Sequence, residues 1–184
     1  YKSKKDFKRS ELNIVYAGQI GFGQNLESIL NALTYNQNKN ITLYLCGEGA
    51  ARRILENKYK NKNIIFLKWL KEKEMFNVFE SCHMALVSLN ASGRQGLILP
   101  GKVQAYVDMN LPILSINSGA TNDFVKKYKI GFSIDAKDDC LKDEIYNLNK
   151  KISLELYNNW LKNLDKVNKS IFSKEKVINQ YLQT

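Results

Sequence analysis

The stretch YAGQIGFGQNLESIL, residues Tyr16–Leu30, is the most informative local pattern in the chain. An apolar run ends here at three glycines, Gly18, Gly21 and Gly23, and an amphipathic stretch with helical spacing follows. A strand, a glycine turn and a helix in this order are how α/β proteins present backbone N–H groups to a phosphate. The stretch therefore predicts a parallel sheet with a nucleotide-binding turn at the end of its first strand.

The same alternation of strand and helix continues along the chain. Apolar runs predict strands over residues 13–17, 41–46, 63–67, 83–89, 112–116 and 131–134. Amphipathic stretches predict helices over 24–35, 50–59 (with Ile54 and Leu55 facing inward), 71–80, 102–108 and 121–128, and helix from 137 on, broken near Lys150 and Ser170. This pattern predicts an α/β fold, a Rossmann-like doubly wound parallel sheet, with ligands at the carboxyl ends of the strands.

The composition is that of a globular protein with an excess of basic residues. The 184 residues include 28 Lys and Arg against 18 Asp and Glu, a net charge of +10. Such an excess favours acidic partners such as nucleotides, nucleic acid or anionic lipid, although lysines spread over a solvated surface would give the same total. The dense block KSKKDFKR predicts a basic linker over residues 1–10, followed by one domain over 11–184.

The cysteines and the single histidine do not form a recognisable metal or catalytic motif. Cys46, Cys82 and Cys140 lack metal-ligand spacing, and this usage favours a reducing, cytoplasmic setting. His83 is expected at the edge of a strand, with its hydrogen bonds satisfied by the fold. No Asp-x-Asp motif occurs, so no metal is expected.

The order of the glycines in the first turn is informative. The turn has the spacing G-x-x-G-x-G, whereas dinucleotide enzymes carry G-x-G-x-x-G. A nicotinamide enzyme is therefore disfavoured, although Glu48 follows the second strand where a ribose-binding acid would lie. Glycines can also occur in such a turn only because its backbone conformation requires them, without any ligand.

A second stretch, LPGKVQAYVDMNLPILSIN at Leu99–Asn117, strengthens the case for phosphate binding. A Pro-Gly turn opens a helix, and Lys102 lies in its first turn. A lysine is unfavourable at a helix N-terminus unless an anion is bound there. Gln104 can both donate and accept, which suits a sugar diol, and it is equally an ordinary polar residue of a helix.

These stretches carry a family resemblance. YAGQIGFGQNLESIL and LYLCGEGAARRIL are similar to the first two strand-and-turn units of a donor-nucleotide-binding domain, and NIIFLKWLKEKEMFNVFESC to the segment that edges the nucleotide base. From about Glu11 to Leu182, the chain resembles the C-terminal half of a group 1 glycosyltransferase, a retaining enzyme with the two-domain GT-B fold. LPGKVQAYVDMNLPILSI is similar to the P-S-K-x-x-x-Y-x-A-x-G-x-P-I segment of the surface-polysaccharide branch, which includes N-acetylfucosaminyl transferases.

The resemblance implies a function and a set of site residues. An acceptor hydroxyl would attack the anomeric carbon of a UDP-linked hexose or N-acetylhexosamine, and no metal or other cofactor would be needed. The leaving diphosphate would be stabilised by the N–H groups of Gly21 and Gly23, the helix that starts near Gly101, and Lys102. The implied nucleotide-sugar-binding residues, with no catalytic residue identified, are Gly18, Gly21, Phe22, Gly23, Gln24, Gly47, Lys68, Trp69, Arg94, Gly101, Lys102 and Gln104.

The sequence departs from the family at charged positions. Gln19 and Gln24 stand where many members carry an arginine and a lysine against the diphosphate. The usual pair of glutamates would fall at Gly96 and Gln104. Neutralisation of the diphosphate is therefore expected from Lys102 and Arg94, with the loop around Arg94 folded over the donor.

The resemblance also implies partners. The reaction of a GT-B enzyme takes place between two domains, so an N-terminal acceptor domain or subunit is expected, with a glycan or lipid-linked acceptor at the inner face of a membrane and no nucleic acid. Two alternatives remain open. A nucleotide-sugar epimerase would use acidic and histidine groups, for which only Glu48 and His83 are at hand. A non-enzymatic nucleic-acid-binding module would need clustered cations with exposed aromatics.

Overall fold

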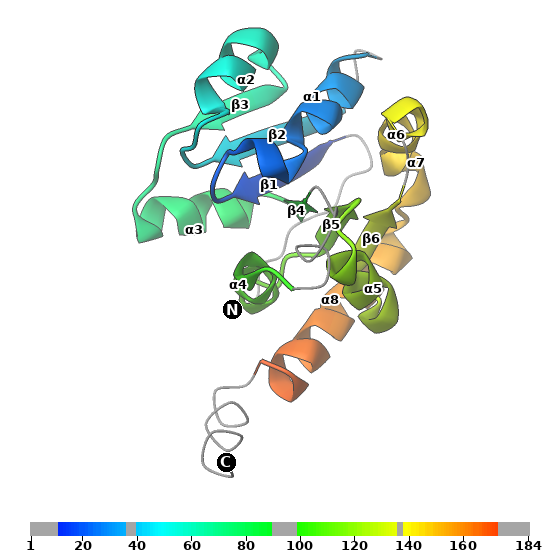
Figure 1. Ribbon diagram of the computed structural model, residues 1–184. Helices are drawn as coiled ribbons and strands as arrows, with labels where there is room; N and C mark the ends of the chain where they lie inside the picture. The colour runs from blue at the N-terminus through cyan, green and yellow to red at the C-terminus, as the bar shows by residue number, and fades with distance from the viewer. Residues whose placement is uncertain (1–10, 36–39, 90–98, 136–137, 173–184) are drawn as a thin grey trace.

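The computed structural model describes residues 11–35, 40–89, 99–135 and 138–172, which form one α/β unit (Figure 1). Six strands form a sheet in the order β3-β2-β1-β4-β5-β6, and every neighbouring pair is parallel. The strands are β1 (Leu12–Ala17), β2 (Ile41–Cys46), β3 (Ile64–Leu67), β4 (Met84–Ser88), β5 (Ile113–Ile116) and β6 (Gly131–Ile134). The doubly wound, Rossmann-like prediction is confirmed, and the direction of winding reverses between β1 and β4.

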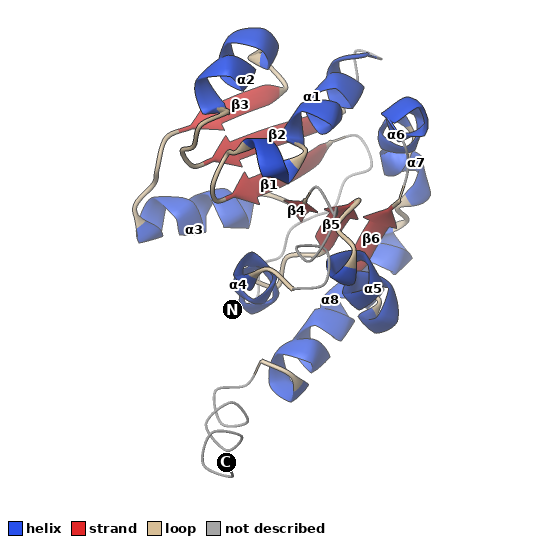
Figure 2. Ribbon diagram, viewed as in Figure 1, coloured by secondary structure: helices blue, strands red, loops and turns tan. Residues whose placement is uncertain are grey.

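Helices cover both faces of the sheet (Figure 2). The buried side chains form two clusters, one on each face of the sheet. One cluster includes side chains from α1, α2, α6 and α7, and the other includes side chains from α3, α4 and α5. Helix α8 contributes to both clusters. The helices are α1 (Leu26–Tyr35), α2 (Arg52–Tyr59), α3 (Glu72–Ser81), α4 (Gly101–Asp108), α5 (Ala120–Tyr128), α6 (Asp138–Tyr146), α7 (Leu148–Lys151) and α8 (Leu154–Ser170), with a 3-10 turn η1 (Phe22–Gln24) before α1.

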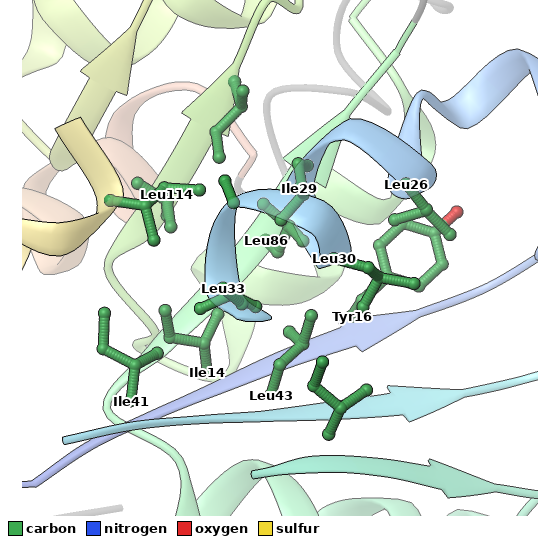
Figure 3. Close-up of a cluster of buried hydrophobic side chains, with 14 of the residues drawn as sticks. Ile14, Tyr16, Leu26, Ile29, Leu30, Leu33, Ile41, Leu43, Leu86 and Leu114 are labelled. Carbon is green, nitrogen blue, oxygen red and sulfur yellow. The ribbon is translucent and has the colours of Figure 1, made fainter. Parts of the chain in front are cut away.

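Helix α1 fixes the position of the glycine turn. It buries the face that its spacing predicts, and Figure 3 shows these side chains above the strands, beside Ile14, Tyr16 and Leu43. Each buried leucine or isoleucine contributes roughly 1.5–3 kcal/mol to stability. The predicted and observed buried residues of this face are Leu26, Ile29, Leu30 and Leu33.

Two expectations about helices are corrected by the structure. Ile54 does not face inward, because α2 buries Arg52, Leu55 and Tyr59 and leaves the Ile54 side chain 57% exposed. Residues two apart on a helix do not share a face, so Arg52 takes the inward position. The helix expected to start at residue 24 is interrupted at Asn25, whose φ of 50° ends the 3-10 turn before α1 begins.

The C-terminal third contains three helices where one broken helix was expected. The first break lies at Asn147 and the second at Ile152 and Ser153, where the Ser153 hydroxyl accepts a hydrogen bond from Leu156 N–H and caps α8. Within the described ranges, no helix is long and apolar enough to cross a membrane. The predicted linker, residues 1–10, lies outside the described residues.

Candidate functional site

The loops that follow β1 and β2 are hydrogen-bonded to each other. Gly18 N–H donates to the Cys46 carbonyl at 2.9 Å, and Ile20 N–H donates to the Glu48 carbonyl at 2.8 Å. Gly47 has a φ of 145°, and a Cβ there would lie 1.9 Å from the carbonyl oxygen of Gly18. Gly47 is therefore required by the close approach of the two loops.

Arg52 holds the end of β2 to the end of β3. Its Nη1 donates to the carbonyls of Gly47 at 2.5 Å and Leu67 at 2.6 Å. Its guanidinium also lies 3.6 Å from Glu48 and 3.5 Å from Glu56. Sequence reasoning did not single out Arg52, because nothing in its local pattern distinguishes it from the exposed Arg53.

Helix α4 brings Lys102 to the turn after β1. The ammonium nitrogen lies 3.2 Å from the position that a Cβ on Gly18 would occupy, and 4.0 Å from the centroid of the Tyr16 ring. Among the described residues, no carboxylate pairs with it. Burial lowers the pKa of Lys102 to about 8, because desolvation disfavours the charged form. The fold thus brings Gly18 and Lys102, two of the predicted site residues, into proximity, and the described residues offer this cation no anionic partner.

Tyr106 fixes α4 against β1. Its buried hydroxyl accepts a hydrogen bond from Ala17 N–H at 3.0 Å and lies 3.3 Å from the Ala17 carbonyl oxygen. Burial raises the pKa of Tyr106 well above its ordinary value, so the hydroxyl stays neutral. Helix α4 follows β4 in the chain and is held at the end of β1, so Lys102 lies where the sheet reverses its winding. Ligands of such sheets usually bind in the crevice at this point.

A cavity of about 310 Å³ opens beside this crevice. Its wall is largely apolar, with one carboxylate from Glu72, and the Trp69 side chain is 75% exposed at its edge. Lys68 is exposed in the same loop. An apolar cavity with few polar groups suits a flat aromatic ligand. The lining residues are Ala17, Gly18, Cys46, Gly47, Trp69, Leu70, Glu72 and Met75.

The second half of the glycine turn lies apart from this cavity. Gly21 N–H donates to Gln24 Oε1 at 2.9 Å, so this N–H group already has a partner. Gly21 and Phe22 line a separate cavity of about 340 Å³, next to α1 and α2, and Phe22 is 70% exposed. A Cβ on Gly23 would meet no atom within 4 Å.

The remaining predicted site residues are distributed as follows. Gly101 and Gln104 are exposed on α4. Arg94 and the loop around it lie outside the described residues. Sequence reasoning missed Tyr16 and Glu72, since a tyrosine in a strand and a glutamate at a helix start carry no signal of a ligand.

His83 lies at the edge of a strand with a hydrogen bond to the fold, as predicted, and the cysteines are free thiols. His83 lies just before β4, at the amino edge of the sheet, and its Nδ1 accepts a hydrogen bond from Asn13 N–H at 2.9 Å. Cys46 and Cys82 are buried free thiols, and Cys140 is exposed. In the part of the chain that the structure describes, no three His, Cys, Asp or Glu residues gather into a metal site.

The fold is shared with solved glycosyltransferases. The chain superposes with a TM-score of 0.70 and 15% identity on a variant of S. aureus TarM in complex with fondaparinux, alpha-GlcNAc-glycerol and UDP, covering 100% of this chain and 37% of that one. The pneumococcal O-GlcNAc transferase GtfA, in complex with UDP and GlcNAc, gives 0.66 and 13%, with 95% and 35% covered.

A single domain matches more completely. The C-terminal domain of a group 1 family glycosyl transferase (LpcC) from Francisella tularensis superposes with a TM-score of 0.66 and 16% identity, covering 89% of this chain and 87% of that one. Identities this low show the fold alone, and the chain spans less than half the length of TarM and GtfA.

A sequence comparison establishes the family. No curated protein matches the chain. The family model described as "Glycosyl transferases group 1" matches residues 11–150, which is more than half of the sequence. On this match, with the fold in agreement, the chain belongs to the group 1 glycosyl transferase family.

Proposed function

We propose that the chain is the donor-nucleotide-binding half of a retaining glycosyltransferase of the surface-polysaccharide branch. It would bind a UDP-linked sugar, from which a hexosyl or N-acetylhexosaminyl group is transferred to a glycan or lipid-linked acceptor. The observation that carries the proposal is Lys102, a half-buried ammonium group at the ligand crevice with no carboxylate partner among the described residues.

The position of Lys102 supports a contact with the diphosphate. A phosphate there would pair with the ammonium group and meet the N–H groups of Gly101 and Lys102 at the start of α4, whereas the Val103 N–H already donates to the Pro100 carbonyl at 2.9 Å. The adjacent 310 Å³ cavity would hold the nucleobase, with Trp69 at its edge. The Gly21 N–H group already donates to Gln24. The negative charge of the diphosphate would therefore be neutralised more by Lys102 and the start of α4 than by the glycine turn.

The proposed chemistry follows from this arrangement. When the acceptor hydroxyl attacks the anomeric carbon, negative charge develops on the leaving diphosphate, and a fixed cation beside it lowers the barrier. The acceptor would be held by an N-terminal domain or subunit facing the carboxyl edge of the sheet. The UDP-bound structures of TarM and GtfA, which share the fold, are consistent with a uridine donor.

The epimerase alternative is less well supported by the geometry. His83, the histidine on which it depended, lies at the amino edge of the sheet, opposite to the crevice, and is hydrogen-bonded to Asn13. Glu48 lies beside Arg52, at 3.6 Å. His83 is therefore not placed for proton transfer at a sugar carbon beside Lys102, and the Glu48 carboxylate lies against a guanidinium group.

Calorimetric titration of two ligands, UDP and uridine, tests the proposal. We expect Lys102→Met to weaken UDP binding by roughly 1.5–3 kcal/mol, about 10- to 150-fold in Kd, because one charge-assisted hydrogen bond is lost. Uridine binding should not change. Lys126→Met, at an exposed position on α5, is the matched control and should bind both ligands normally. Equal losses for UDP and uridine would show that Lys102 does not contact phosphate.

A further inference from the structure

The aromatic ring of Tyr16 lies next to the ammonium group of Lys102. The nitrogen is 4.0 Å from the ring centroid, within the range at which an aromatic face attracts a cation. Tyr16 is fully buried, and its hydroxyl donates to the Gln19 carbonyl at 2.6 Å. Figure 3 shows its ring beside Leu26 and Leu30 of α1. The ring is therefore a fixed surface built into β1 and its turn.

We propose that Tyr16 is the positioning residue of the nucleotide site, whose ring holds the Lys102 ammonium group at the crevice between β1 and β4 for contact with the donor diphosphate. This inference rests on the proposed function. Tyr16 is a buried core residue, and under this proposal its ring also contributes to the electrostatics of nucleotide binding.

The need for such a residue follows from the chemistry of lysine. An ammonium group on a four-carbon stem is strongly hydrated and free to rotate, so it loses entropy when it is fixed on a ligand. Here Gly18 leaves room for the nitrogen, because a Cβ at that position would lie only 3.2 Å away. The Tyr16 ring provides an attractive face where no carboxylate could be placed without neutralising the cation. The lysine is thus held in place while its charge remains available to a phosphate.

The contacts between the Tyr106 hydroxyl and the Ala17 backbone fix helix α4 relative to strand β1. They join α4, which carries Lys102, to β1, which carries Tyr16, at distances of 3.0 and 3.3 Å. The distance between ring and cation is consequently set by rigid elements on both sides. A ligand that approaches the crevice would find the ammonium group already in place.

A fluorination series at position 16, compared with Tyr16→Phe, tests the inference at nearly constant volume of the core side chain. Tyr16→Phe keeps the ring but removes the hydroxyl that donates to the Gln19 carbonyl, so it is the reference against which the fluorinated side chains are compared. Mono-, di- and trifluorophenylalanine at the same position withdraw electron density from the ring face step by step at nearly constant size. We expect UDP affinity to fall with each fluorine, to a total of about three- to tenfold, while uridine affinity stays constant.

The same series in the Lys102→Met background provides the decisive comparison. If Tyr16 acts through the cation, fluorination has no effect on UDP binding once the cation is gone. A flat series in the wild-type background, or equal losses in both backgrounds, would overturn the role of Tyr16. Loss of UDP binding in Lys102→Met together with a flat fluorination series would reject this inference alone, whereas unchanged UDP binding in Lys102→Met would reject the proposed function itself.

Discussion

Lys102 is placed where it costs the protein stability. A half-buried ammonium group with no carboxylate partner in the described ranges is partly desolvated, and burial lowers its pKa from 10.5 to about 8. The contact with the Tyr16 ring offsets only part of this cost. A residue that weakens the folded state and faces the ligand crevice is typical of binding sites, where function and stability compete.

This conflict predicts that Lys102→Met stabilises the fold at neutral pH. The folded-state pKa lies below the unfolded one, so the unfolded chain binds more protons between about pH 8 and 10.5. The penalty is therefore fully present below pH 8 and disappears as the pH rises through that window. We expect the variant to gain roughly 1–3 kcal/mol in the free energy of unfolding at pH 7, and little above pH 10.5.

Urea unfolding of wild type and variant at pH 7 and pH 10.5 measures this difference. Other titrating groups change equally in both proteins, so the comparison isolates position 102. A variant that is less stable than the wild type at pH 7 would contradict the buried, partly desolvated state of the lysine.

At the scale of elements, the two glycine loops at the carboxyl edge have different requirements. Gly47 lies at φ 145°, against the Gly18 carbonyl, whereas Gly23 has ordinary backbone and open space around it. The loops after β1 and β2 thus meet through Gly47, whereas Gly23 is exposed in the part of the turn that lies apart from the 310 Å³ cavity.

The variant Gly23→Val distinguishes an effect on UDP binding from an effect on stability. If a phosphate approaches this backbone, we expect Gly23→Val to weaken UDP binding at least about tenfold, a cost near 1.4 kcal/mol, with little change in Tm without ligand. Gly47→Ala is the structural comparison and should lower the free energy of unfolding by at least about 2 kcal/mol, because it combines strain with a backbone clash. Unchanged UDP affinity in Gly23→Val would show that the exposed part of the turn does not contact the ligand.

Arg52 joins two strand ends and a helix, so its removal should affect stability strongly. Arg52→Met leaves the carbonyls of Gly47 and Leu67 without their donor, and we expect a loss of roughly 2–4 kcal/mol in the free energy of unfolding. Arg53→Met, one residue further on and exposed, is the matched control and should stay within about 0.5 kcal/mol of the wild type. Equal effects of the two substitutions, measured by urea unfolding, would mean that the two carbonyl contacts add nothing to stability.

On the scale of the whole molecule, the described residues form one α/β unit with a single carboxyl edge. The chain covers 37% of TarM and 87% of the isolated LpcC domain, so its extent is close to that of the LpcC domain. Under the proposed function, the donor would be bound at this edge and the acceptor by a separate domain or subunit.

We therefore expect the purified 184-residue chain to bind UDP without transferring sugar. Binding of UDP should raise Tm, and at 100 times its Kd the ligand adds about 2.7 kcal/mol to the free energy of unfolding. Transfer is measured with radiolabelled UDP-sugars and a panel of lipid-linked and soluble acceptors. Robust transfer by the chain alone would show that no second domain or subunit is needed.

Most of the fold follows from local patterns in the sequence. The strands Ile41–Cys46 and Gly131–Ile134 were predicted to the residue, because apolar runs bounded by polar or glycine residues are local features. The glycine turn and the Pro-Gly-Lys start of α4 were likewise visible as local patterns. The inward direction of Ile54 was wrong, because a short helix buries few positions and its rotation is set by what it packs against.

The construction of the site depends on contacts between distant elements. The tertiary structure paired Lys102 with the ring of Tyr16 and joined Ala17 to Tyr106, 89 positions apart in the sequence. The Gly21 N–H group donates to Gln24, and Lys102 lies next to Gly18 and not next to Gly21 or Gly23. Periodicity records which face of an element is buried, but the contacts between elements depend on rotamers and close packing that no local pattern contains. The sequence thus determined that a cation and a glycine turn would lie at one edge of a parallel sheet, and packing decided which glycine and which aromatic ring meet that cation.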